Sequence, residues 1–222
     1  MINGDTGLVG LLGNPVRHSL SPAMHNAALQ ALQLNWSYLA LPCTSQNLQE
    51  VLQGLRAVNC RGLNVTIPHK QDVATLCQEL SPLAKRLGAV NTLIPIDSGG
   101  WHGTNTDVEG FLTPLGEESS WNNRHGVILG CGGSARAVAA GLQRLGLASI
   151  TVIGRRPAAP GGLEASLPEG ANAALVDVSD ERLSWFASLG LNTLRVGVHW
   201  SLYEVAPDTT RPDQSRLHLG CI

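Results

Sequence analysis

The chain has 222 residues, of which 43% are hydrophobic and 14% charged, and its formal net charge is −2. This composition can bury a core but provides no basic field that would concentrate nucleic acid or an anionic membrane surface. No apolar run reaches the roughly 18 to 20 residues of a membrane helix, and no signal peptide is visible, so we expect a cytoplasmic protein with a small-molecule partner. The cysteines and histidines are scattered without metal-ligand spacing, so we expect no metal.

The first half of the chain alternates short apolar runs with helical patterns, which is typical of α/β proteins. Ser21 followed by Pro22 predicts an N-cap and a first helical residue. The turn around Gly99 predicts that two strands pair beside it. We expect strands at 8–12, 37–41, 62–67, 89–96 and 100–104, and helices at 21–32, 46–58, after residue 70, at 82–87 and at 107–115.

A polar stretch at residues 116–125 predicts a linker or an exposed corner between two domains. Beyond it, the pattern of a doubly wound sheet begins. We expect strands at 127–129, 149–153 and 174–178, and helices at 134–145 and 179–189. The resulting hypothesis is a first domain at 1–107, a second at 108–205 and a divergent, disordered tail at 206–222.

A glycine-rich segment follows the first strand of the second domain and opens the next helix. Its sequence fits the dinucleotide fingerprint G-x-G-x-x-[GA], in which small residues let the backbone approach a pyrophosphate at a helix N-terminus. The alternative is an ordinary glycine-rich turn. The predicted nucleotide-binding residues are Gly130, Gly132, Gly133, Ser134 and Ala135, with Cys131 between the first two glycines.

Two arginines follow the next predicted strand, where an NAD site would usually carry an acidic residue. The guanidinium groups of Arg155 and Arg156 could hold a 2′-phosphate through charge-assisted hydrogen bonds. We therefore expect NADP as the cofactor. The alternative is that both arginines are solvated loop charges.

Polar side chains interrupt the first-half elements at their ends, where they can converge on one crevice. Ser19 and Ser21 lie beside the positive end of a predicted helix, which suits a carboxylate. For either serine considered alone, the better interpretation is structural, with Ser21 as a cap and Ser19 as an exposed residue. Strand alternation puts Asn64 and Thr66 on one face, with Val65 on the other.

A lysine and an aspartate complete this polar set. Lys70 falls at the start of a predicted helix, where the dipole opposes its positive charge and favours proton exchange. Asp107 is the obvious partner for Lys70, and it could also be an N-cap. Asn91 lies in the segment Gly88-Ala89-Val90-Asn91-Thr92 between them.

In order and spacing, five segments resemble the successive motifs of the shikimate dehydrogenase family. They are Ser-Leu-Ser-Pro, Asn-Val-Thr-Ile-Pro-His-Lys, Gly-Ala-Val-Asn-Thr, Asn-Thr-Asp and Gly-Cys-Gly-Gly-Ser-Ala-Arg. The resemblance implies an α/β substrate domain followed by a Rossmann-like NADP-binding domain. It also implies reversible NADPH-dependent reduction of 3-dehydroshikimate to shikimate, a step of aromatic amino acid biosynthesis.

The resemblance assigns roles to individual residues. Ser19 and Ser21 would bind the shikimate carboxylate, and Lys70 would be the catalytic acid and base. Asp107 would orient Lys70. The residues that would hold ring hydroxyls are Asn64, Thr66, Asn91 and Asp107.

The chain departs from the family in its last part. Leu194 and Arg195 break the family's Asn-Thr-Thr-Pro pattern, and no motif matches beyond Gly197. We therefore expect an incomplete Rossmann-like domain that lacks the usual C-terminal region. Three alternatives remain: a catalytically impaired fragment that only binds NADP(H) or shikimate, a quinate/shikimate dehydrogenase, and another dehydrogenase of similar build. The oligomeric state is open, with a homodimer as one candidate.

Overall fold

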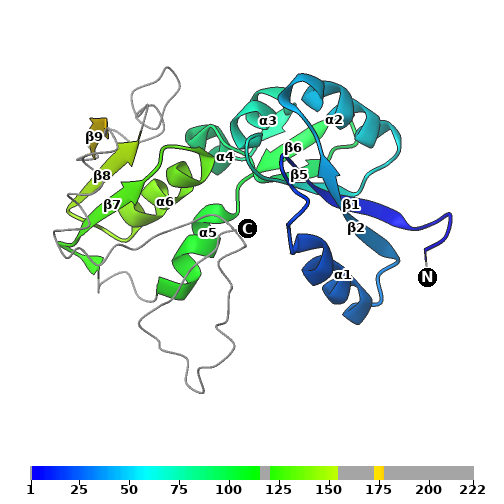
Figure 1. Cartoon of the computed structure of the whole chain (residues 1–222), viewed down its shortest axis with the longest axis horizontal. Helices are drawn as coiled ribbons and strands as arrows, with labels where there is room; N and C mark the ends of the chain where they lie inside the picture. The colour runs from blue at the N-terminus through cyan, green and yellow to red at the C-terminus, as the bar shows by residue number, and fades with distance from the viewer. Residues whose placement is uncertain (1, 116–120, 155–172, 178–222) are drawn as a thin grey trace. The chain divides into compact units, whose positions relative to one another are not determined.

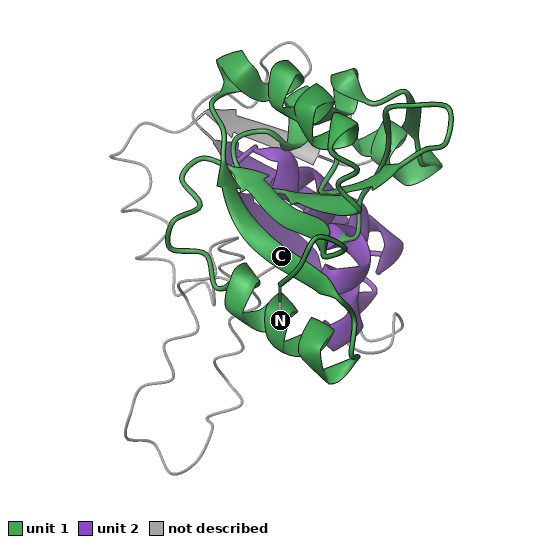
Figure 2. Ribbon diagram, turned by 90° about the vertical axis from the view of Figure 1, so that its right-hand side faces the viewer, with its two compact units in different colours: residues 1–106 green, residues 107–222 purple. Residues whose placement is uncertain are grey.

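A computed structural model of the chain describes residues 2–115, 121–154 and 173–177 (Figure 1). The chain divides into two compact units, residues 1–106 and 107–222, which are coloured separately in Figure 2. The polar stretch at 116–125 therefore falls inside the second unit. No helix within the described ranges is long and apolar enough to cross a membrane.

The first unit is a six-stranded mixed sheet with helices on both faces. Its strands are β1 (Gly7–Gly13), β2 (Trp36–Pro42), β3 (Gly62–Val65), β4 (Glu79–Leu80), β5 (Thr92–Pro95) and β6 (Trp101–Thr104). Its helices are α1 (Ser21–Ala31), the 3₁₀ turn η1 (Ser45–Asn47), α2 (Leu48–Ala57), α3 (Lys70–Leu76) and α4 (Pro82–Leu87). The strand order is β2-β1-β3-β5-β6-β4, with β1 parallel to both β2 and β3, and β5 antiparallel to β3 and β6.

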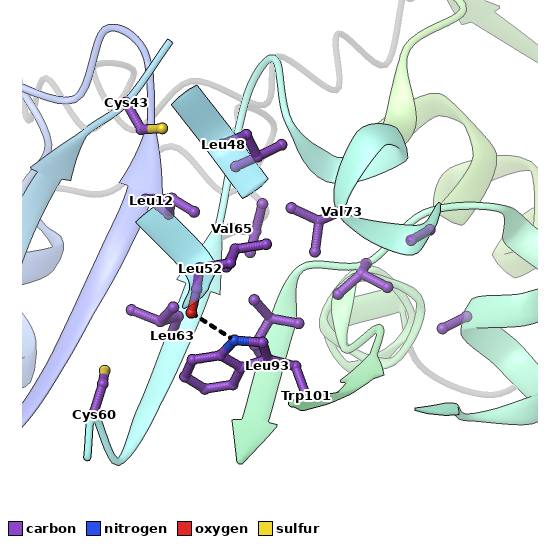
Figure 3. Close-up of a cluster of buried hydrophobic side chains, with 13 residues drawn as sticks. Leu12, Cys43, Leu48, Leu52, Cys60, Leu63, Val65, Val73, Leu93 and Trp101 are labelled. Carbon is purple, nitrogen blue, oxygen red and sulfur yellow. Dashed lines mark hydrogen bonds between the residues drawn. The ribbon is translucent and has the colours of Figure 1, made fainter. Parts of the chain in front are cut away.

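The main core of this unit lies where α2, α3 and α4 cover one sheet face (Figure 3). Leu52 of α2 and Val73 of α3 pack against Leu63 and Trp101 of the sheet. The Trp101 indole donates a 3.1 Å hydrogen bond to the Leu52 carbonyl, which satisfies a buried polar group. On the opposite face, α1 contributes Leu29 to a smaller apolar cluster around Leu11, Val16 and Tyr38.

The expected elements of this unit are present, with four differences. The strand expected at 89–96 is shorter, since β5 spans only Thr92–Pro95. The first helix begins at Ser21 itself, and Leu20 occupies the N-cap position, so the prediction that Ser21 is the N-cap was wrong. Strand β3 ends at Val65 because residues 67–69 form a turn, and Ile67 is consequently 63% exposed. The two-residue strand β4 was not predicted, since so short a segment carries no periodicity. By contrast, Ser81 caps α4 as expected, accepting a 3.1 Å hydrogen bond from the Ala84 amide.

The second unit contains a three-stranded parallel sheet, as the doubly wound pattern predicts. Its described elements are α5 (Asp107–Leu112), the 3₁₀ turn η2 (Thr113–Leu115), β7 (His125–Leu129), α6 (Gly133–Arg144), β8 (Ser149–Gly154) and β9 (Ala173–Asp177). The strand order is β7-β8-β9, all parallel. Phe111 of α5 packs so closely on Gly141 of α6 that a Cβ atom there would lie 2.6 Å from the ring. The expected helix at 179–189 and the tail at 206–222 lie outside the described residues.

Candidate functional site

The two predicted carboxylate-binding serines lie where the chain enters α1. Ser19 is partly buried, and its hydroxyl oxygen accepts a 3.2 Å hydrogen bond from the Ser21 amide, which leaves its own O–H available to an acceptor. Ser21 is fully buried, and its hydroxyl makes no hydrogen bond of standard geometry to the residues that the structure describes. The Ser21 hydroxyl lies beside the Tyr38 phenol, and the role of the two serines in carboxylate binding stays a prediction.

A chain of hydrogen-bonded side chains joins the two predicted asparagines across the sheet. The Tyr38 hydroxyl reaches over β1 and donates a 2.8 Å bond to Asn64 Oδ1, while Asn64 Nδ2 lies 3.5 Å from Thr92 Oγ1. Thr92 Oγ1 in turn donates a 2.9 Å bond to Asn91 Oδ1, and the Thr106 amide donates to the same oxygen at 3.0 Å. Asn91 Nδ2 also donates a 3.0 Å bond to Thr106 Oγ1, so the network fixes the orientation of both amide groups.

Tyr38 is the first residue of this hydrogen-bond network, and burial opposes ionisation of its phenol. It is 3% exposed and stacks on His25 with a centroid separation of 4.2 Å and an interplanar angle of 9°. Burial raises the pKa of the Tyr38 phenol, and the Ser21 hydroxyl offsets part of this rise. The phenol thus stays protonated and remains a donor to Asn64.

Thr66 and Lys70 lie on the short connection between β3 and α3. A Cβ atom on Gly13 would lie 2.5 Å from the Thr66 methyl carbon, so the methyl group packs against that glycine and the hydroxyl must point elsewhere. Lys70 is the first residue of α3 and is only 4% exposed. Its carbonyl accepts a 2.7 Å bond from the Val90 amide, which ties the start of α3 to the segment that carries Asn91.

In the first unit, the structure thus brings Asn64, Asn91 and the backbone of Lys70 into one connected network. Asp107 begins α5 in the second unit and is 3% exposed, and its expected partnership with Lys70 stays a prediction. The sequence reading missed Tyr38, Thr92 and Thr106 as members of this network. In the sequence, these residues differ from their surroundings only in carrying a hydroxyl group inside, or next to, an apolar strand. Tyr38 and Asn64 line a cavity of about 250 Å³, together with His25 and Leu29 of α1.

The glycine-rich segment of the second unit has the geometry expected of a nucleotide loop. Gly130 follows β7 with a φ of +111°, a conformation that favours glycine, and Gly132 is the N-cap of α6. Around both glycines the space that a Cβ atom would enter is open, and Ala135 packs into the core behind them. The open loop at a helix N-terminus therefore fits a pyrophosphate.

Arg136 and Cys131 lie next to this loop, and their surroundings affect the charge of Arg136. Burial lowers the pKa of Arg136, which is 5% exposed, and the nearby Cys131 partly offsets that change. Arg155 and Arg156 lie outside the described residues. Among the described residues there is no cluster of three or more metal-ligating side chains.

Comparison with known proteins places these features in one family. Residues 11–93 match the family model of the shikimate dehydrogenase substrate binding domain. The chain is 42% identical over 211 residues to a shikimate dehydrogenase (NADP(+)) of Prochlorococcus marinus strain MIT 9215, covering 92% of this chain and 72% of the relative. It is 50% identical over 155 residues to the corresponding protein of strain AS9601, covering 70% of this chain and 54% of the relative. The chain thus spans about half the length of several curated relatives that it matches.

Solved structures agree with this result. Shikimate dehydrogenase from Aquifex aeolicus is similar with a TM-score of 0.70 and 33% identity, covering 82% of this chain and 66% of that one. The enzyme from Thermus thermophilus, solved in complex with NADP(H) and shikimate, is similar with a TM-score of 0.64 and 37% identity, covering 76% and 63%. The likeness is one of fold and of sequence over about four fifths of this chain.

Proposed function

The chain belongs to the shikimate dehydrogenase family, and on this premise we propose that it interconverts 3-dehydroshikimate and shikimate with NADP(H) as cofactor. The observation that carries the proposal is the side-chain network from Tyr38 to Thr106, which orients Asn64 and Asn91 beside the start of α3, where the buried Lys70 lies. Polar side chains held in fixed orientations, together with a buried lysine, suit a substrate with several hydroxyl groups and one carbonyl group. The relative from Thermus thermophilus, which was solved with shikimate and NADP(H), supports the same assignment.

The chemistry assigned to the chain's own residues is binding and proton transfer. Ser19 and Ser21 would receive the carboxylate, and Asn64, Thr66, Asn91 and Asp107 the ring hydroxyls. NADPH bound at the glycine-rich loop supplies the hydride. Lys70 Nζ would donate a proton to the carbonyl oxygen as it becomes a hydroxyl, and would remove that proton in the oxidation. Asp107 would balance the charge of Lys70.

The cofactor assignment rests on the glycine loop and on the two arginines after β8. The open space around Gly130 and Gly132 supports pyrophosphate binding at the N-terminus of α6. Arg155 and Arg156 are proposed to bind the 2′-phosphate. Calorimetry with NADP and with NAD measures this preference. Equal affinities would contradict the arginine assignment while leaving the pyrophosphate site intact.

Lys70→Ala tests the catalytic role. We expect turnover of shikimate with NADP to fall about 100- to 10,000-fold, since a positioned acid or base contributes about that much, while shikimate affinity changes far less. Lys85→Ala is the control, because Lys85 is an exposed residue of α4. Near-normal turnover in Lys70→Ala would refute the role.

The same assay separates two further candidates. The first candidate is a fragment that binds shikimate or NADP(H) without turnover, because the chain spans only about half the length of several relatives. Calorimetry with both ligands identifies that case. Parallel assays with quinate test the quinate/shikimate alternative. A cytoplasmic location and a homodimer also belong to the proposal, and light scattering measures the assembly state.

A further inference from the structure

The imidazole of His69 occupies an enclosed position directly before Lys70. The residue is 0% exposed and holds the N-cap position of α3 without a capping side-chain bond. Instead, its Nε2 atom lies 2.7 Å from the carbonyl oxygen of Cys43, in the segment that follows β2. The side chain therefore ties the start of α3 to the segment that follows β2.

The hydrogen-bond partner of His69 determines which tautomer the ring adopts. A carbonyl oxygen only accepts, so Nε2 must carry the hydrogen. The Nδ1 atom is buried and has no hydrogen-bond partner among the described residues. The contact with the Cys43 carbonyl therefore selects the Nε2–H tautomer of the ring.

The contact of His69 is one of several hydrogen bonds, together called the brace, that hold the start of α3 next to Lys70. The Cys43 amide donates a 3.1 Å bond to the Gly13 carbonyl, which anchors the accepting segment to the end of β1. On the other side, the Lys70 carbonyl accepts the 2.7 Å bond from Val90. The first turn of α3 is thus held from two sides, and His69 provides a side-chain hydrogen bond on one of them.

We propose that His69 is a positioning residue that sets the place of the Lys70 ammonium group through its Nε2–H bond to Cys43. The inference rests on the proposed function, in which Lys70 transfers the proton. Displacing a catalytic group by about 1 Å can lower a rate by about 100-fold, so a brace of this kind is kinetically significant.

The variants His69→Gln and His69→Asn form a matched pair. The glutamine amide nitrogen can reach the position of Nε2, whereas the asparagine amide reaches only as far as Nδ1. Asparagine is also a favoured N-cap residue, so α3 should still form. We expect His69→Gln to keep kcat within about 3-fold and His69→Asn to lose about 10- to 100-fold, with the KM for shikimate little changed in both.

A second readout does not depend on turnover. The chain has only two lysines, Lys70 and Lys85. Trace labelling with acetic anhydride, followed by peptide mass spectrometry, gives the reactivity of Lys70 relative to the exposed Lys85. We expect this ratio to match the wild-type value in His69→Gln and to change by about 3-fold or more in His69→Asn, because the ammonium moves relative to its surroundings.

The outcomes separate the positioning role from the proposed function. Equal labelling ratios in the two variants, whether both normal or both altered, would overturn the positioning role. If the wild-type chain shows no turnover but the labelling ratios still differ between the variants, the positioning role stands and the dehydrogenase assignment fails. Urea unfolding of both variants verifies that each is folded before labelling.

Discussion

The hydroxyl of Tyr38 donates a 2.8 Å hydrogen bond to Asn64 Oδ1, although the two residues are 26 positions apart and β1 lies between their strands. Two inter-strand spacings amount to about 9.5 Å, a distance that the long Tyr38 side chain, the hydrogen bond and the Asn64 side chain cover together. The bond uses the acceptor of Asn64 and so directs its amide N–H groups. The predictions below begin with this pair.

Tyr38→Phe should leave Asn64 Oδ1 without its buried donor. We expect a loss of about 1 to 3 kcal/mol in the free energy of unfolding, measured by urea denaturation, and weaker shikimate binding by calorimetry, because the amide is free to rotate. Trp36→Phe on the same strand is the control, since Trp36 is 41% exposed and should tolerate the change. Unchanged shikimate affinity in Tyr38→Phe would mean that Asn64 does not depend on this bond.

Thr66 offers a test that separates its hydroxyl group from its methyl group. Thr66→Val keeps the contact with Gly13 and removes the hydroxyl, so we expect shikimate affinity to fall about 3- to 10-fold, the value of one hydrogen bond, with little change in stability. Thr66→Ser removes the methyl and keeps the hydroxyl, so it should lose packing but retain affinity. The opposite pattern in calorimetry would remove Thr66 from the substrate site.

The two loop glycines should respond differently to alanine. Gly130 has a φ of +111°, so Gly130→Ala should cost about 1 to 3 kcal/mol of stability through backbone strain. Gly132 has a φ of −79° and open space around its Cβ position, so Gly132→Ala should fold normally. The added methyl would occupy space needed by the pyrophosphate, and we expect weaker NADP binding by fluorescence titration. Normal NADP affinity in a folded Gly132→Ala protein would argue against a dinucleotide at this loop.

His25 should make the chain less stable in mild acid. Burial lowers the pKa of His25 from its ordinary 6.5, so the unfolded chain binds more protons than the folded one just below that pH. Stability therefore falls as the pH drops through about 6.5. His25→Phe keeps an aromatic ring against Tyr38 and removes the titration, so its unfolding free energy should depend less on pH between about 7 and about 5. Parallel pH curves for the two proteins would assign the titration to another group.

The sequence predicted most of the described elements because local physics controls them. Apolar residues repeat with the period of a strand or a helix, Ser81 caps α4, and the positive φ of Gly130 needs no tertiary contact to favour glycine. The same holds for the polar clusters, whose residue types and spacing were visible before any fold was known. Their resemblance to one family followed from this linear order.

Tertiary structure alone decided which side chains complete the site. Tyr38, Thr92 and His69 bond to partners on other strands or loops, and such pairs depend on strand order and register, which no local pattern specifies. The start of α1 at Ser21 and the end of β3 at Val65 were likewise set by packing and by a turn. The sequence therefore determined the chemical groups and their order along the chain. The folded sheet determined how Asn64, Asn91 and Lys70 are held, because hydrogen bonds between distant residues exist only after the strands have paired.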